Sequence, residues 1–247
     1  ASSASYTVSY AWIPSTRGVY NVTASALSVS GEEVLLNNAA TSIVYVRVAE
    51  VALISDSIEL LPLSRILVSM NLNYDIYDFN RRHLYTENLS LLKGYIAVVF
   101  YCFQRDITEN EYTALENYLT QNGRLLVTGW GSIVWGPRLA SIVRSSTSGG
   151  WHDTQTLIVV DETHPIMNGP YGKFPVGYTL WPLSIGCGFA KADKARGAVT
   201  VADMGGGYDK IIATKGLPGK VVYWNGELPF DILWCRDPPR AMLKNTI

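Results

Sequence analysis

The chain has 247 residues, of which 48% are hydrophobic and 17% charged, and its 20 basic and 21 acidic side chains give a formal net charge of −1. This apolar content is enough for a folded core and excludes wholesale disorder, while a general nucleic-acid binder would show a basic excess. No apolar run approaches the roughly 20 residues that a membrane-spanning helix needs, and the polar first residues show no signal peptide.

The first 49 residues predict β-structure and no helix. Alternating and β-branched residues predict three strands, at 5–13, 19–29 and 42–48. Turn-forming residues lie between them, at 14–18, 31–33 and 37–38. Because three strands cannot bury both faces of a sandwich, we expect this region to need partner strands.

Four short motifs follow one another in this region: Trp12-Ile13-Pro14, the run 18–24, Gly31-Glu32 and Asn37-Asn38. In this order they resemble the second half of an immunoglobulin-like adhesion domain of the CARDB type. The resemblance implies a partial β-sandwich over residues 1–49 whose first half is absent. We therefore expect that the chain is a piece of a longer protein, or that a partner chain supplies the missing strands.

From Val51 onward strands and helices alternate. Apolar runs predict buried strands at 51–55 and 95–101, and further strands are expected at 73–78 and 124–128. Apolar residues at helical spacing predict a helix over 58–70, and 84–93 is expected to be a short helix or turn. Thr108 and Glu111 form a capping-box pattern at the start of a further helix, which Gly123 is expected to end. This alternation predicts a parallel sheet with helices on both faces.

The sequence beyond Ser145 is less regular. Strands are expected at 156–160, 198–202, 211–214 and 220–224, and a terminal helix at 239–247. Gly205-Gly206-Gly207 is interpreted as a hairpin turn, because it does not lie between a strand and a helix as a nucleotide-binding loop would.

The order of these segments, together with the motif His164-Pro165-Ile166-Met167-Asn168-Gly169 and the runs 219–224 and 242–245, resembles the class I glutamine amidotransferase-like superfamily. Within it the ThuA-like branch is the most similar. The resemblance implies a flavodoxin-like α/β domain over residues 50–247.

Catalytic members of that superfamily carry a cysteine nucleophile at a glycine-flanked elbow between a strand and a helix, where helix-terminal amides stabilise the thiolate and the oxyanion. The matching elbow here is Gly129-Trp130-Gly131-Ser132, with Trp130 at the position of the nucleophile. An indole cannot attack a carbonyl, so we expect the amidotransferase activity to be absent and the domain to be non-catalytic.

Three other residues leave an enzymatic alternative open, namely a degenerate hydrolase or a sugar-modifying enzyme. Ser132 is either a nucleophile or a helix cap. His164 is either a base at the elbow or part of a structural turn, with its ring bonded to the backbone. Cys102 either lies at the crevice or is a buried cysteine at the end of a strand.

Folds of this class bind ligands at the carboxyl ends of their parallel strands. The residues expected in such a crevice are Asp56, Tyr101, Cys102, Gln104, Trp130 and His164. Two of them, Tyr101 and Trp130, are suited to stack on a sugar ring, which makes carbohydrate the expected ligand. The alternative is that Trp130 fills the former active site.

No metal site or cofactor is predicted, because the three histidines and three cysteines show neither zinc-ligand spacing nor a CxxC pair. Calcium stays open, since oxygen donors occur in loops at Asp56, Asp75, Asp78 and Asp153, although without EF-hand spacing. The disulfide state of Cys102, Cys187 and Cys235 stays open. The sequons at Asn21 and Asn88, the low charge and the 15 tyrosines are typical of exported proteins. We therefore expect a structural or binding module of a larger exported or cell-surface protein. Its expected partners are the rest of its own chain or neighbouring subunits, and carbohydrate.

Overall fold

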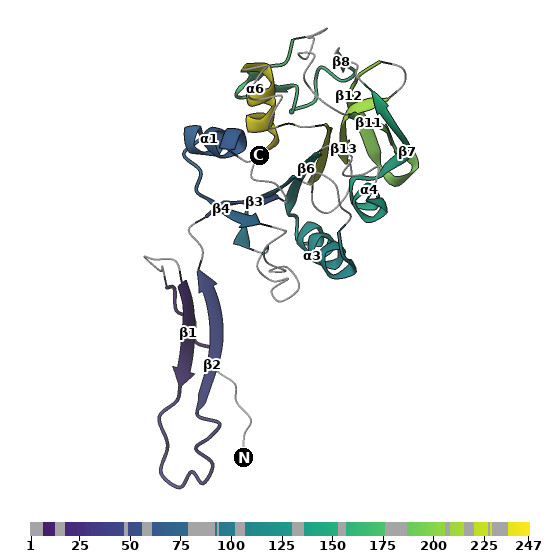
Figure 1. Cartoon of the computed structure of the whole chain (residues 1–247). Helices are drawn as coiled ribbons and strands as arrows, with labels where there is room; N and C mark the ends of the chain where they lie inside the picture. Colours follow the sequence, from purple (N-terminus) through teal and green to yellow (C-terminus); the bar gives the residue numbers. More distant parts are fainter. Residues whose placement is uncertain are drawn as a thin grey trace. The chain divides into compact units, whose positions relative to one another are not determined.

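The computed structural model in Figure 1 divides into two compact units, Ala1–Val48 and Ala49–Ile247, and each is described by itself. The residues that the structure describes are 7–12, 18–46, 49–55, 61–78, 92, 94–101, 107–129, 136–152, 157–175, 187–205, 208–214, 220–226, 228 and 237–247.

The first unit contains one antiparallel hairpin. Strand β1 (Gly18–Ser25) pairs with β2 (Ala39–Val46) from Gly18↔Val46 to Ser25↔Ala39. The loop between them turns where the sequence predicts, with backbone bonds from Glu32 to Val29 and from Asn38 to Leu35. Residues 7–12 form no strand, and the side chain of Val8 is 81% exposed, so the strand predicted over 5–13 is wrong for its described part.

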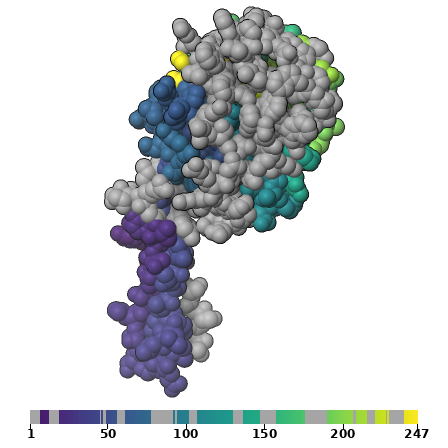
Figure 2. Space-filling model, in the orientation of Figure 1, coloured from purple at the N-terminus to yellow at the C-terminus, as the bar shows by residue number. Residues whose placement is uncertain are grey.

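The hairpin buries neither of its faces within its own unit. No described side chain of this unit is buried, and several β-branched residues of both strands are exposed; Figure 2 shows the surface of this segment in purple. A two-stranded hairpin is at best marginally stable by itself in water.

The second unit is built on an eight-stranded sheet with the order β4-β3-β5-β6-β14-β13-β12-β8. Five strands are parallel: β4 (Tyr74–Asp78), β3 (Val51–Ser55), β5 (Ala97–Tyr101), β6 (Arg124–Gly129) and β14 (Lys220–Asn225). Three further strands continue the sheet with antiparallel pairing: β13 (Asp209–Thr214), β12 (Ala198–Asp203) and β8 (Ile158–Val159). The predicted α/β class is confirmed, but the sheet is mixed, since β12 and β13 form a hairpin around Gly205, whose φ is 84°.

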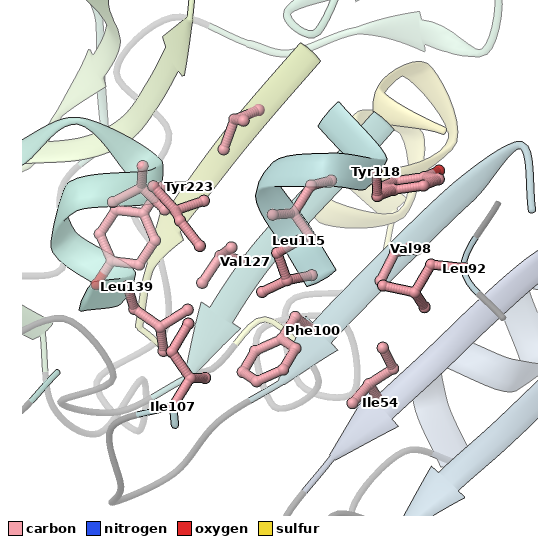
Figure 3. Close-up of a cluster of buried hydrophobic side chains, with 14 of the residues drawn as sticks. Ile54, Leu92, Val98, Phe100, Ile107, Leu115, Tyr118, Val127, Leu139 and Tyr223 are labelled. Carbon is pink, nitrogen blue, oxygen red and sulfur yellow. The ribbon is translucent and has the colours of Figure 1, made fainter. Parts of the chain in front are cut away.

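Helices cover both faces of the sheet, as predicted. Helices α1 (Leu61–Ser69) and α6 (Asp237–Thr246) pack on one face, with Val51, Leu53 and Val99 beneath them. Helices α3 (Glu109–Thr120) and α4 (Pro137–Val143) pack on the other face, over the cluster drawn in Figure 3. Strands β3 and β5 are buried on both faces, which explains their continuous apolar sequences.

The two ends of α3 follow from its sequence in different ways. Thr108 and Glu111 form the predicted capping box. At the other end, Asn122 rather than Gly123 adopts the left-handed conformation, with a φ of 63°. Gly123 is needed for a different reason, because a Cβ there would lie 2.4 Å from the ring of Tyr118.

The elements that the sequence analysis did not predict lie mainly beyond residue 136. They are α4, the antiparallel pair β7 (Ser145–His152) and β11 (Cys187–Ala192), the short pair β9 (Asn168–Gly169) and β10 (Gly172–Lys173), and the 3-10 turn Lys194–Arg196. The helix or turn predicted over 84–93 lies almost wholly outside the described residues. Among the helices that are described, none has the length and apolarity to cross a membrane.

Candidate functional site

The parallel strands place four residues at one edge of the sheet. Strands β3, β5, β6 and β14 end at Ser55, Tyr101, Gly129 and Asn225, and the register pairs Ser55 with Tyr101 and Asn225 with Gly129. This carboxyl edge is where the sequence predicts a crevice. Tyr101 lies there as expected, but its side chain is fully buried in the core on the α1 and α6 face, so the expectation that it offers a ring to a sugar is wrong.

Gly226 and Leu228, which follow β14, are hydrogen-bonded to the end of β6. The Thr128 hydroxyl donates to the carbonyl of Gly226 at 2.7 Å and accepts from the N–H of Leu228 at 3.1 Å. The Gly129 N–H donates to the same Gly226 carbonyl at 2.9 Å. Thr128 is completely buried, so its hydroxyl serves this strand-to-loop junction and is not presented to a ligand.

At the same edge, a buried polar side chain of β14 is hydrogen-bonded to the backbone of β13. The side-chain amide of Asn225 donates to the carbonyl of Asp209 at 3.0 Å, and its oxygen accepts from the Tyr223 hydroxyl at 3.2 Å. Lys210 is the extra residue of a bulge, since Ala202 pairs with Ile211 and the next residue of β12 pairs with Asp209. Bulges redirect side chains, and here the Lys210 ammonium lies 5.2 Å from the ring centre of Trp224 while the residue is only 1% exposed.

Burial raises the pKa of the Asp209 carboxyl above its ordinary value of 3.8, although the N–H of Ala192 donates to it at 2.5 Å. A carboxyl whose pKa is raised in the folded state binds more protons there than in the unfolded chain. Its contribution to stability is therefore present at low pH and is lost as the pH rises past the unfolded value.

We accordingly expect Asp209→Asn, which cannot titrate but keeps an oxygen for Ala192, to gain stability relative to the wild type as the pH rises from about 4 to about 7. Urea unfolding at both pH values measures this difference. Asp161→Asn is the control of opposite sign, measured below about pH 4, because hydrogen bonds from Thr163 lower the pKa of Asp161 and its stabilising charge is lost only as the pH falls through that lowered pKa. A difference for Asp209→Asn that stays constant with pH would contradict the expectation.

His164 lies at the opposite edge of the sheet, which corrects its assignment to the crevice. Strand β8 runs against the parallel strands, so the chain that follows it emerges at their amino ends. His164 there lines a cavity with Arg124 and Lys220, the first residues of β6 and β14. Its Nδ1 accepts from the N–H of Ile166 at 3.3 Å, so the interpretation as a structural turn with the ring bonded to the backbone is confirmed.

The remaining predicted site residues are placed only in part. Asp56, Cys102, Gln104, Trp130 and Ser132 lie outside the described residues, as do Asn88 and Cys235. Asn21 is exposed in the middle of β1, opposite Ile43, and Cys187 begins β11. In the part of the chain that is described, no three acidic, histidine or cysteine residues are grouped as a metal site would require.

The sequence analysis missed two features of this unit. The buried Lys210 is hidden in sequence because it lies within an apolar strand pattern, and the bulge that redirects it depends on pairing with β12. The other feature is the pair Arg124 and Lys220. Each is a cation followed directly by an apolar run, which the sequence shows, but the two become neighbours only through the register of β6 with β14.

The second unit is thus a flavodoxin-like α/β domain with a mixed sheet, in which Gly226 and Leu228 after β14 are hydrogen-bonded to the carboxyl end of β6. Among solved structures, a ThuA-like protein from Bacteroides uniformis is similar, with a TM-score of 0.54 and 12% identity over 82% of this chain and 91% of that one. A ThuA-like protein from Parabacteroides merdae has a TM-score of 0.55 and 10% identity over 81% and 89% of the two chains.

A third solved structure, the carbohydrate deacetylase Agd3, is similar over 73% of this chain and 29% of its own, with a TM-score of 0.50 and 10% identity. At these identities the likeness shows the fold. No protein-family model matches the sequence, and no curated protein matches it.

Proposed function

We propose that the chain is a non-catalytic binding module of a larger exported or cell-surface protein. The observation that carries the proposal lies at the carboxyl ends of β6 and β14, where the Thr128 hydroxyl and the Asn225 amide both hold neighbouring backbone in place. A catalytic elbow needs a nucleophile there with a base beside it. The sequence has Trp130 at the elbow, and the distance of His164 from this edge speaks against a hydrolase that pairs it with Ser132.

We propose carbohydrate as the ligand of this module. Support comes from the fold, which resembles a part of a carbohydrate deacetylase, and from Trp130, which directly follows the end of β6 in the sequence. An indole offers a broad apolar face together with one N–H donor, a combination that suits a sugar ring.

We further propose that the β1–β2 hairpin is part of an immunoglobulin-like sandwich completed by other strands, either from the same longer chain or from a neighbouring subunit. The support is physical: the hairpin exposes residues such as Val22 and Ile43, and a hairpin of two strands does not bury enough apolar surface to be stable. The exposed Asn21 in β1 is compatible with a glycosylated, exported protein.

Oligosaccharide binding measured by calorimetry, run beside assays for glutamine, ester and glycoside hydrolysis, tests the proposal. We expect saturable binding without turnover, and a loss of at least about tenfold in affinity on Trp130→Ala. Tyr171→Ala is the matched control, because Tyr171 is 50% exposed and lies beside the end of α6. Turnover that disappears on Ser132→Ala would overturn the non-catalytic assignment, and unchanged binding by Trp130→Ala would overturn the carbohydrate site.

A further inference from the structure

A cavity of about 360 Å³ lies at the amino edge of the sheet, opposite the edge discussed above. Its floor is formed by the first residues of β5, β6 and β14, and its sides by the last residues of α6 and the turn that contains His164. Its volume is within the range of cavities that hold small molecules.

Two cations, Arg124 and Lys220, lie at this cavity. Arg124 and Lys220 are register partners on adjacent parallel strands, whose backbones are about 4.8 Å apart. Like charges at such positions repel and cost stability. Among the described residues that line the cavity there is no aspartate or glutamate, and no described group bonds to the Lys220 ammonium.

The Arg124 guanidinium is only partly engaged. Its Nη1 donates to the main-chain oxygen of Ile247, the residue after α6, at 2.9 Å. A guanidinium has five N–H donors, so most of them remain for an anion that lies between Arg124 and Lys220.

The rest of the cavity lining is mixed: the polar residues His164, Thr214, Asn245 and Thr246 line it together with apolar strand residues. Val99, Leu126 and Val222 belong to the buried core on this face and also line the cavity. Asn245 fixes one wall, because its amide donates to the carbonyls of Ile166 and Gly172 and its oxygen accepts from the N–H of Tyr171. A preformed cavity of this kind avoids the cost of ordering its walls when a ligand binds.

We propose that this cavity binds a small organic anion, with its carboxylate or phosphate group between Arg124 and Lys220 and its apolar part against Val99, Leu126 and Val222. The site is separate from the proposed carbohydrate site and does not depend on it. The positive pair selects for an anionic group, and the apolar lining selects for a short hydrocarbon or ring next to that group.

Calorimetric titration of the whole chain with hexanoate, hexyl phosphate, inorganic phosphate and hexanol tests the proposal. We expect both hexyl anions to bind at least about tenfold more tightly than hexanol and than inorganic phosphate. The stronger of the two hexyl anions identifies the preferred anionic group. Equal binding of hexanol and hexanoate, or no binding of either hexyl anion, would overturn the proposal.

Charge-removing variants locate the site. Arg124→Gln combined with Lys220→Gln is expected to reduce hexanoate affinity at least about tenfold, whereas Arg65→Gln combined with Lys194→Gln, two exposed cations away from the cavity lining, leaves it unchanged. Because Arg124 also holds the end of α6, Lys220→Gln by itself is the second test, with an expected loss of about threefold. Undiminished binding by a folded Lys220→Gln variant would assign the anion to another place.

Discussion

Replacing Trp224 with alanine is expected to lower the free energy of unfolding by about 4 kcal/mol, the middle of the range for buried aromatic residues. Trp224 is completely buried in β14, in the core that α1 and α6 cover. Alanine leaves a large cavity there and also removes the aromatic face 5.2 Å from the Lys210 ammonium, a contact that contributes about 1 kcal/mol or more when it is desolvated.

Urea unfolding measures this loss, with Trp224→Phe as the control that retains an aromatic face. We expect phenylalanine to cost less than half as much as alanine, because it fills most of the space and keeps the ring beside Lys210. Equal costs for the two variants would contradict the role given to the ring, and a cost below about 1 kcal/mol for alanine would contradict the burial of Trp224.

The parallel half of the sheet is predictable from sequence because its strands are buried on both faces. Residues 51–55 and 97–101 are continuous apolar runs, and no helix of that length would be stable between turn signals. The capping box of α3 is equally local, since Thr108 and Glu111 are three residues apart.

Strand β7 could not be predicted in this way. It begins Ser145-Ser146-Thr147-Ser148-Gly149-Gly150, a composition typical of a loop. These residues form a strand because β11, about 40 residues further along the chain, pairs with them. Tertiary pairing here overrides local preference.

The candidate site was the least predictable part, because its contacts join distant segments. The bond between Thr128 and Gly226 spans 98 residues of sequence. His164 was assigned to the wrong edge because a motif gives its position along the chain, while the edge depends on the direction of β8, which only the pairing with β12 determines. The same argument explains why Arg124 and Lys220 could be seen in the sequence but not paired.

Thr128→Val is expected to destabilise the chain by about 2 kcal/mol although valine has almost the same shape as threonine. The variant leaves the buried N–H of Leu228 without its acceptor and takes one donor from the Gly226 carbonyl, which keeps its bond from Gly129. Thr128→Ser loses only a methyl group and keeps both hydrogen bonds, so we expect a cost of about 1 kcal/mol.

Hydrogen exchange at Leu228 separates this mechanism from a general loss of packing. The Leu228 amide should remain protected in Thr128→Ser and exchange faster in Thr128→Val, since only valine removes its acceptor. Because Thr128 lies two residues before Trp130, the valine variant should also show altered oligosaccharide binding at that edge, while hexanoate binding at Arg124 and Lys220 stays the same. Equal protection of Leu228 in the two variants would mean that the Thr128 hydroxyl does not hold this segment in place.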